Sequence, residues 1–298
     1  MKIVNIIGGL GNQMFQYAFA LSMKEKLTNE NVLIDTSHFH SLFFHHYKGM
    51  NLHQGYELDS TFPNLSLKKA RWHQLVRVTW FIPNYLLSRI GRKFLPKRNS
   101  EYIEPTQETY KFNPSVYTRE KNIYFEGYWQ SVKYSEIALD KLKHEFEHPA
   151  PNQYNKSMID SIQQSNSVGI HIRRGDYINN KGFGGICDLD YYKRALNKIG
   201  IGGKVFFIFS NDIEWCQDNI QPLLNNANII YVTENKGKQS HWDMFLMTYC
   251  KNLIIANSSF SWWGAVLNRN ENAVIIAPKK WNNHFDNVDI YRESWIKI

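Results

Sequence analysis

A short apolar segment, residues 168–172, ends abruptly at Arg173, Arg174, Gly175 and Asp176. Its length and branched side chains predict a parallel strand that is buried on both faces. Consecutive side chains of an extended chain point to opposite sides, so one arginine can face an anionic ligand while the other anchors to the protein, for instance to Asp176. A guanidinium group holds phosphate oxygens with two hydrogen bonds. These residues therefore predict an anion site beyond the carboxyl end of a strand.

Two simpler interpretations compete with this one. An isolated Arg-Arg-Gly-Asp run is more often a solvated cluster of salt bridges than a ligand site. Arg-Gly-Asp also occurs as an adhesion signal, but that role needs an exposed loop tip, and here the tripeptide follows a predicted core strand. The salt-bridge interpretation is outweighed only by the other motifs in the chain.

A glycine-rich loop near the start, residues 8–13, lies between an expected strand (2–7) and an expected helix (14–27). This order aims backbone N–H groups and a helix N-terminus at an anion. It is not the dinucleotide-binding fingerprint, because Met14 stands where the third glycine would fall, and no Gly-Lys-Ser/Thr follows as in a P-loop. Taken alone, the loop is more often a tight turn without a ligand.

The elements that position these motifs alternate along the chain. The first half contains expected strands at 2–7, 32–35 and 123–130, and the Pro-rich segment 148–153 marks a boundary. Beyond it, strands are expected at 168–172, 205–209, 228–232, 253–256 and 273–277, with helices from about residues 191, 242 and 261. Strands separated by helices predict a parallel, doubly wound sheet. We therefore expect an α/β protein with domains at 1–150 and 151–298.

Composition narrows the class of protein. With 298 residues, 43% of them hydrophobic, the chain is long enough for two globular domains. Three widely spaced cysteines suit neither a disulfide framework nor a paired zinc site, and fit a reducing cytosol. The first residues are too short an apolar run for a signal peptide, and no run reaches the roughly 18–20 residues of a membrane span. We expect a cytoplasmic protein.

Four motifs, taken in order, resemble the motif set of α1,2-fucosyltransferases of the bacterial type, glycosyltransferase family 11. They are Gly-Gly-Leu-Gly-Asn-Gln-Met-Phe-Gln-Tyr at 8–17, His-Ile-Arg-Arg-Gly-Asp-Tyr at 171–177, Phe-Ser-Asn-Asp at 209–212 and Asn-Ser-Ser-Phe-Ser-Trp-Trp-Gly-Ala at 257–265. Residues 127–130 resemble a further segment of the family. The similarity therefore covers most of the chain and is weakest over 36–122.

The resemblance implies a GT-B type fold, in which two Rossmann-like domains face each other across a cleft. Residues 151–298 would bind GDP-fucose, and residues 1–150 would form the acceptor side. The implied reaction is the metal-independent, inverting transfer of L-fucose from GDP-β-L-fucose to the 2-hydroxyl of a terminal galactose or similar sugar on a glycan. The product would be an α1,2 linkage, as in the synthesis of O-antigen or another glycan.

Matching positions give the candidate site residues. The implied catalytic residues are Arg173 and Asp176, the implied acceptor-binding residues are Tyr128, Trp129 and Gln130, and the implied GDP-fucose-binding residues are Gly9, Gly11, Asn12, His171, Arg173, Asp243, Ser258 and Ser259. Breaking a sugar–diphosphate bond builds negative charge on the β-phosphate, and Arg173 would supply fixed positive charge there. An ordinary core strand is an equally good interpretation of the aromatic run at 123–130.

The carboxylates have more than one interpretation. Asp243 can accept hydrogen bonds from N1–H and the N2 amine of guanine, or can simply be a favourable charge at a helix N-terminus. Asp176 is the carboxylate nearest to the phosphate clamp, yet it can instead orient one of the arginines. Related enzymes carry a glutamate after this motif, but residues 179–182 read Asn-Asn-Lys-Gly. The general base stays open.

An Asp-x-Asp sequence at 188–190 resembles the metal and nucleotide signature of a different glycosyltransferase fold. It directly precedes an expected helix, so either aspartate can cap the helix by accepting from its first N–H groups. We prefer the cap, and expect no metal and no cofactor beyond the donor substrate.

Two other functional classes remain as alternatives. A non-catalytic protein that binds glycans or nucleotide sugars would also use Trp and Tyr, but it would release no GDP. A nucleic-acid binder would use the net charge of +8, yet the basic residues are not interleaved with aromatic residues near the expected site. We expect GDP-fucose and a glycan as partners and no nucleic acid.

The basic charge is concentrated between residues 60 and 100. This segment contains no Asp or Glu, and without its nine basic residues the rest of the chain would have a net charge of −1; they are Lys68, Lys69, Arg71, Arg77, Arg89, Arg92, Lys93, Lys97 and Arg98. Apolar residues at helical spacing accompany them, chiefly Trp72, Leu75, Val76, Leu86, Leu87, Ile90 and Phe94. Such a segment, 68–98, can lie on an anionic membrane at the cytoplasmic face, or its apolar residues can simply be core.

Overall fold

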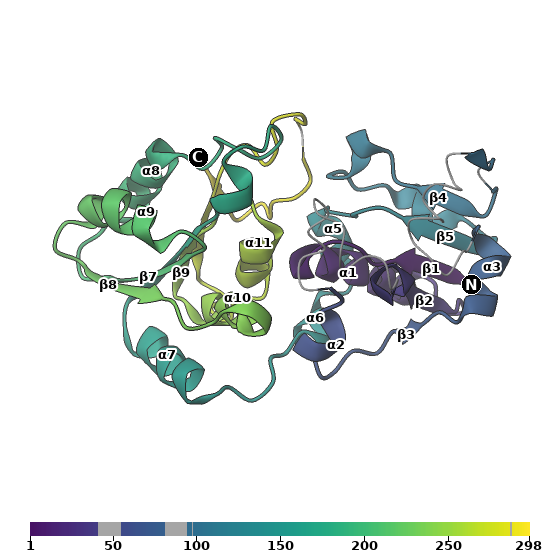
Figure 1. Cartoon of the computed structure of the whole chain (residues 1–298), viewed down its shortest axis with the longest axis horizontal. Coiled ribbons are helices and arrows are strands. Elements are labelled where there is room, and N and C mark those ends of the chain that lie inside the picture. The colour runs from purple at the N-terminus through teal and green to yellow at the C-terminus, as the bar shows by residue number, and fades with distance from the viewer. Residues whose placement is uncertain (41–54, 81–93, 97, 287) are drawn as a thin grey trace. The chain divides into compact units, whose positions relative to one another are not determined.

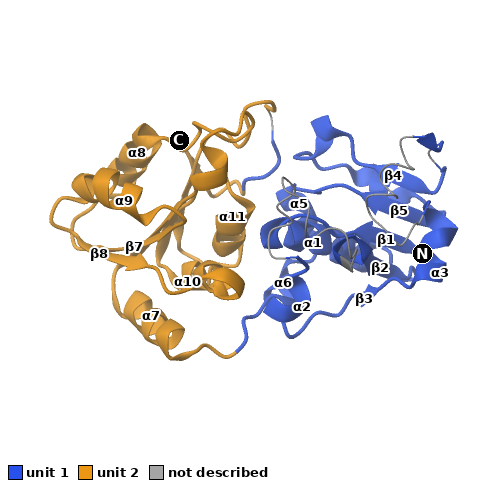
Figure 2. Cartoon of the chain, viewed as in Figure 1, with its two compact units in different colours: residues 1–149, 288–291 blue, residues 150–287, 292–298 orange. Residues whose placement is uncertain are grey.

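The computed structural model describes residues 1–40, 55–80, 94–96, 98–286 and 288–298. They form two compact units, shown in Figure 2. Unit 1 consists of Met1–Pro149 and Val288–Tyr291, and unit 2 consists of Ala150–Asn287 and Arg292–Ile298. Residues 288–291 therefore belong to unit 1, whereas the expected domain 151–298 had placed them in the second domain. In this segment the Asp289 carbonyl accepts from the Val132 N–H at 2.7 Å, and the Asp289 N–H donates to the Tyr110 carbonyl at 2.6 Å.

The sheet of unit 1 has the strand order β3-β2-β1-β5-β4, and every pair is parallel. Its strands are β1 (Lys2–Asn5), β2 (Val32–Asp35), β3 (Lys68–Lys69), β4 (Glu101–Ile103) and β5 (Ile123–Glu126). The helices of this unit are α1 (Leu10–Lys26), α2 (Leu58–Thr61), α3 (Trp72–Val78), α5 (Val132–Ile137) and α6 (Leu139–Glu145). The strand order changes direction between β1 and β5, so loops leave the sheet to opposite sides at that point.

The core of unit 1 forms around α1. This helix is buried from Leu10 to Met23, apart from Asn12, and its Phe19 ring stacks on the Trp129 ring at 3.9 Å between centroids. Short 3-10 turns at Ser37–His40, Thr106–Glu108 and Pro114–Thr118 complete the described connections. A helix that is buried on nearly every side is an interior element of its unit.

The sheet of unit 2 has the order β11-β10-β9-β6-β7-β8, again with all pairs parallel. Its strands are β6 (Ser167–Ile172), β7 (Val205–Ser210), β8 (Asn228–Val232), β9 (Asn252–Ile254), β10 (Val274–Ala277) and β11 (Ile296–Lys297). The helices are α7 (Gln153–Gln164), α8 (Leu189–Ile199), α9 (Ile213–Asn219), α10 (His241–Tyr249) and α11 (Ser259–Val266), with 3-10 turns at Gly175–Tyr177, Gln221–Leu224 and Gly237–Gln239 (Figure 1). This is the order of a Rossmann fold, with its switch point between β6 and β9.

Side chains on one face of the β6 strand pack against α8 and α9. Val168, Ile170 and Ile172 share a buried cluster with Tyr191 and Cys216. Gly169 points to the other face, where a Cβ atom would lie 2.7 Å from Leu253 Cδ2 and 2.9 Å from Cys250 Sγ. The absence of a side chain at Gly169 therefore permits the close packing of β6 and β9 at the switch point.

The two parallel sheets confirm the α/β class, and most expected elements are present with shifted ends. The strand expected at 2–7 stops at Asn5, and the helix expected from residue 14 already begins at Leu10. The glycine-rich loop is thus shorter than expected, because Gly11 and Asn12 belong to the first turn of α1. Helix α7 was not predicted, although its moderate amphipathic pattern follows the Pro-rich boundary directly. None of the described helices has the length and hydrophobicity that crossing a membrane requires.

Replacing Gly169 with Ala should destabilise the protein. The added Cβ overlaps two buried side chains, and overpacking of this kind costs about 1–3 kcal/mol. Gly202→Ala is the matched control, because nothing lies within 4 Å of a Cβ there and the backbone needs no glycine. Urea denaturation of both variants measures the difference. Equal denaturation midpoints would mean that the space between β6 and β9 can expand.

Candidate functional site

The motif residues of unit 2 follow three neighbouring strands. Residues 173–176 come after β6, 211–212 after β7 and 257–259 after β9. All three strands are parallel and adjacent in the sheet, so these residues meet at its carboxyl edge. Arg173 and Ser258 follow the two strands that flank the switch point, where open α/β sheets bind ligands.

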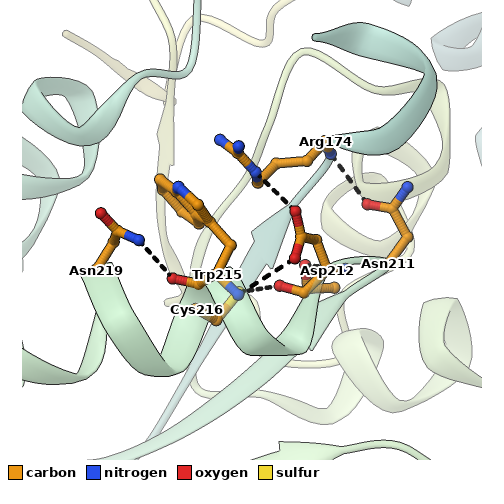
Figure 3. Close-up of polar contacts among 7 residues, drawn as sticks. Arg174, Asn211, Asp212, Trp215, Cys216 and Asn219 are labelled. Carbon is orange, nitrogen blue, oxygen red and sulfur yellow. Dashed lines mark hydrogen bonds and ion pairs between the residues drawn. The ribbon is translucent and has the colours of Figure 1, made fainter.

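Arg174 anchors the end of β6 to the end of β7 (Figure 3). Its N–H donates to Asn211 Oδ1 at 2.9 Å, its Nε donates to Asp212 Oδ2 at 2.9 Å, and its guanidinium carbon lies 4.1 Å from the centre of the Trp215 ring. Asp212 also caps α9 by accepting from the Trp215 N–H at 3.2 Å. One arginine of the pair is therefore an anchor, as expected, and its partner is Asp212.

Gly175 connects the two arginines to the following turn. Its φ of +40° is unfavourable for other residues, and a Cβ atom would lie 2.6 Å from Asn211 Nδ2. A side chain here would displace the amide that holds the Arg174 backbone. The glycine is therefore required for the anchor itself.

The Arg173 side chain pairs with Asp176. Its Nε lies 2.9 Å from Asp176 Oδ1, and its Nη2 donates to Asp176 Oδ2 at 3.0 Å. The two side chains are 31% and 52% exposed. An ion pair with this much exposure contributes only about 0–1 kcal/mol to stability. The Arg173–Asp176 ion pair is the kind of salt bridge that an isolated Arg-Arg-Gly-Asp run predicts. Through it, Asp176 orients the Arg173 guanidinium.

His171 lies in β6 just before the arginines and is buried. Burial first, and then the charge of Arg173, lower the pKa of the imidazole to about 3. Its Nδ1 has no hydrogen-bond partner among the described residues. The ring is thus neutral at physiological pH, where it can form hydrogen bonds but is too weak a base to accept a proton readily.

The late motif connects to the arginine motif through Ser258. Its hydroxyl hydrogen-bonds the Tyr177 side chain, and burial is the main reason that the pKa of Tyr177 rises to about 12. The neighbouring Asn257 donates from Nδ2 to the carbonyls of Phe183 and Trp281 at 3.1 and 3.2 Å. Ser259 is the first residue of α11. Sequence reasoning gave Asn257 and Tyr177 no role, although both lie inside the motifs.

Asp243 lies in the first turn of α10. Burial raises the pKa of its carboxyl to about 7, and a hydrogen bond from Asn235 Nδ2 to Asp243 Oδ1, 2.9 Å long, opposes that rise. The carboxylate therefore titrates near neutral pH. Asn235 was not recognised from the sequence, because it lies outside every motif.

The candidate residues of unit 1 meet at the carboxyl edge of its own sheet. Gln16 joins the loops after β1 and β5, since its Oε1 accepts from the Ile7 N–H at 2.8 Å and its Nε2 donates to the Gly127 carbonyl at 3.1 Å. Gln130 Nε2 donates to Asn12 Oδ1 at 2.7 Å. Asn12, which the sequence assigned to donor binding, is thus in direct contact with Gln130, which it assigned to acceptor binding. Gly9 and Gly11 are the chain neighbours of this contact.

Trp129, assigned from the sequence to acceptor binding, is a core residue in this structure. Its ring is 1% exposed and packs on Phe19, as the core-strand interpretation expected. Tyr128, in contrast, is 40% exposed. Gln130 is buried, and its amide is engaged by Asn12.

Glu104 holds the turn that contains Tyr128 and Trp129. Its Oε2 accepts from the N–H groups of these residues at 2.8 and 3.2 Å, and Trp129 has a left-handed φ of 55°. Burial raises the pKa of Glu104 to about 7. The sequence gave no indication of this contact, because Glu104 is distant in the chain from the turn.

The Asp-x-Asp sequence is a helix cap, as expected. Asp188 Oδ1 accepts from the Tyr191 N–H at 2.8 Å at the start of α8. Asp190 forms an ion pair with Arg194 one turn along the same helix. Both carboxylates therefore have local structural roles.

Each unit has a parallel sheet of the Rossmann type, and each carries candidate residues near its switch point. Such α/β units are typical of nucleotide-binding proteins. The sequence model of glycosyl transferase family 11 matches residues 92–298. The chain belongs to this family of glycosyltransferases.

Individual relatives agree with the family. The sequence is 32% identical to an α-1,2-colitosyltransferase of Escherichia coli, over 99% of this chain and 98% of that protein. It is 30% identical to the O-antigen biosynthesis glycosyltransferase WbnK of Escherichia coli, over 98% of both. Among solved structures, NodZ α-1,6-fucosyltransferase soaked with GDP-fucose aligns with a TM-score of 0.49 and 12% identity, over 89% of this chain and 91% of that one.

Proposed function

We propose that this protein transfers L-fucose from GDP-β-L-fucose to the 2-hydroxyl of a terminal galactose, or of a similar sugar on a glycan, and forms an α1,2 linkage. The single observation that carries this proposal is the position of Arg173, a partly exposed guanidinium at the switch point of unit 2 whose only described ion pair is weak. Family membership supports glycosyl transfer. The names of two relatives support the 1,2 linkage: the α-1,2-colitosyltransferase and a galactoside α-(1,2)-fucosyltransferase of Rattus norvegicus, which is 23% identical over 90% of this chain and 67% of that protein.

In the proposed reaction the acceptor hydroxyl attacks the anomeric carbon of fucose from the face opposite to GDP. The bond from that carbon to the β-phosphate oxygen breaks, GDP leaves with the electron pair, and the hydroxyl loses its proton. A β-linked donor therefore gives an α-linked product. Arg173 stabilises the charge that develops on the β-phosphate, and Ser258 and the neutral His171 contribute hydrogen bonds beside it.

The remaining assignments follow the division into two units. Asp243 accepts hydrogen bonds from the guanine edge, and Ser259 lies with Ser258 at the start of α11. Gly9, Gly11 and Asn12 contribute backbone and amide groups of unit 1 to the donor, while Tyr128, whose ring is exposed, contacts the acceptor glycan. Asp176 keeps the fork of Arg173 oriented.

Replacing Arg173 with Lys should reduce the rate by about 10² to 10³, the value of one fixed donor to the transition state. Lysine keeps the charge but loses the fork. A coupled assay of GDP release with GDP-fucose and a galactoside acceptor measures the rate. Arg174→Lys is the contrasting variant, because it loses the contacts to Asp212 and Trp215 and should lower the thermal unfolding temperature. An Arg173→Lys enzyme with normal turnover and stability would remove Arg173 from the proposed clamp.

The same assay distinguishes fucosyl transfer from colitosyl transfer and from the mere binding of nucleotide sugars. A protein that only binds nucleotide sugars will bind GDP-fucose and release no GDP. A colitosyltransferase will prefer GDP-colitose, whose sugar lacks the 3-hydroxyl of fucose. Faster turnover of GDP-fucose than of GDP-colitose is the result that our proposal requires.

The transfer should not need a divalent metal. Arg173 and the N–H groups at helix ends can neutralise a diphosphate, and Asp188 and Asp190 already serve α8. We expect the rate to be unchanged after dialysis against EDTA. Loss of activity that is restored by Mn²⁺ or Mg²⁺ would require carboxylate ligands and would contradict this prediction.

We also propose that a surface of unit 1 contacts an anionic membrane. Helix α3 divides its apolar residues between two faces: Leu75 and Val78 are buried in the core, while Trp72 is 68% and Val76 42% exposed. Phe94 is 83% exposed, and Arg98 lies over the Trp80 ring. Exposed aromatic residues in a basic segment match the interface of a bilayer that carries negative lipids. Leu86, Leu87, Ile90, Arg89, Arg92, Lys93 and Lys97 lie outside the described residues.

The protein should sediment with vesicles that contain phosphatidylserine and should be released by salt, because each basic residue near the lipid contributes about 1 kcal/mol. Trp72→Ala should weaken the binding, whereas Val274→Ala, at an exposed apolar position of unit 2, should not. Equal binding to neutral vesicles, or equal effects of the two variants, would refute an anionic membrane as the partner.

A further inference from the structure

Asp243 lies at the end of a chain of side-chain amides. Asn152, Asn155 and Asn235 are hydrogen-bonded in series, and the last of them donates to Asp243. Asn155 and Asn235 form a reciprocal pair: Asn155 Nδ2 donates to Asn235 Oδ1 at 3.1 Å, and Asn235 Nδ2 donates to Asn155 Oδ1 at 2.9 Å. Both side chains are buried. Neither residue belongs to a motif of the family resemblance.

The backbone of α7 fixes the direction of every hydrogen bond in this chain. Asn152 caps α7, because its Oδ1 accepts from the Asn155 N–H at 2.8 Å. That same oxygen accepts from Asn155 Nδ2 at 3.0 Å, so the oxygen of the Asn155 amide must face Asn235. The amide nitrogen of Asn235 is then used for Asn155 Oδ1 and, with its second hydrogen, for Asp243 Oδ1 at 2.9 Å.

A flip of either amide would bring like groups together. With Asn235 reversed, its oxygen would face Asp243 Oδ1, and its nitrogen would face Asn155 Nδ2. In a buried site each unsatisfied polar group costs about 1–3 kcal/mol. The helix cap at Asn152 therefore determines that Asp243 receives a donor on Oδ1, which favours its ionised, accepting form.

We propose that Asn155 and Asn235 are positioning residues for nucleotide recognition, which keep Asp243 a hydrogen-bond acceptor and so make the site prefer guanine over adenine. This inference rests on the proposed function, in which Asp243 accepts from the guanine edge. Guanine offers two neighbouring donors, N1–H and the N2 amine. Adenine offers an acceptor at N1, which a carboxylate would repel. A site built to accept from donors discriminates strongly against a ligand that lacks them.

The surroundings make Asp243 the group that titrates near neutral pH. Helix α10 packs against α7 and α11, and α11 carries no ionisable side chain. From α7, the Tyr154 phenol interacts with Asp243; its pKa is raised, mainly by burial, so it stays neutral. The pKa of His241 is lowered by burial. The other charged groups of these segments are Lys156 and Asp160 of α7 and Glu234, and all three are exposed.

The pH dependence of base preference tests the proposal. The pKa of Asp243 is about 7 in the free protein, and guanine binds the ionised form, so GDP affinity should fall as the pH drops through about 7. The ratio of GDP affinity to ADP affinity is the useful quantity, because titration of the diphosphate itself affects both nucleotides equally. Calorimetric titrations from pH 5.5 to 8.5 give this ratio.

Asn235→Ala removes the hydrogen bond that lowers the pKa of Asp243. The midpoint of the fall in the ratio should therefore move to higher pH, and the ratio at pH 7 should drop by about tenfold or more. Asn235→Asp, of nearly the same shape, should move the midpoint further, because a second carboxylate opposes ionisation. Asn155→Ala should have a smaller effect of the same sign. Asn219→Ala, which loses one amide hydrogen bond to the Trp215 carbonyl elsewhere in unit 2, is the matched control and should leave the ratio unchanged.

Asp243→Asn separates this inference from the proposed function. If that variant keeps the wild-type preference for GDP and its pH dependence, Asp243 does not read the base and that part of the proposed function fails. If Asp243→Asn abolishes the preference but both Asn235 variants keep the wild-type midpoint, Asp243 reads the base and the amide chain has no part in it. A shift of the midpoint in Asn219→Ala would also overturn the inference.

Discussion

The ion pair between Arg174 and Asp212 is the interaction on which the candidate site of unit 2 depends. It joins the ends of β6 and β7, caps α9 through the same carboxylate and places the guanidinium over Trp215. Arg173, the preceding residue, pairs instead with Asp176. Gly175 is also needed for this anchor, because a Cβ atom there would collide with the Asn211 amide that accepts from the Arg174 N–H.

Unit 1 joins its strand ends with neutral amides. Gln13 and Gln16 are fully buried, and they hydrogen-bond backbone groups of the loops around the start of α1 and the end of β5. Buried amides at these positions are expensive unless every group finds a partner, so they fix one arrangement of the loops. The two glutamines of the motif at 8–17 therefore fix the conformation of the neighbouring loops. Tyr128, in the loop after β5, is exposed.

Two carboxylates, Glu104 of unit 1 and Asp243 of unit 2, each have a pKa near 7. Burial is the main cause in both, and hydrogen-bond donors only partly offset it. A folded-state pKa above the ordinary value means that the folded protein binds protons more strongly than the unfolded chain, so both groups reduce stability as the pH rises from about 4 to about 7.

The sequence alone determined the α/β class, the two domains, the family and the strand ends that carry Arg173, Asn211 and Ser258, because these depend on hydrophobic periodicity and on contiguous motifs. It also identified the cap at Asp188, which is local. Only the tertiary structure decided which arginine is the anchor, that Trp129 is core and that residues 288–291 return to unit 1. It also decided that Glu104 holds the turn at 128–129 and that Asn155 and Asn235 form a hydrogen-bonded chain to Asp243. Each of these depends on contacts between residues distant in the chain. Local periodicity carries no record of such contacts, since burial and amide direction are set only when the strands and helices pack.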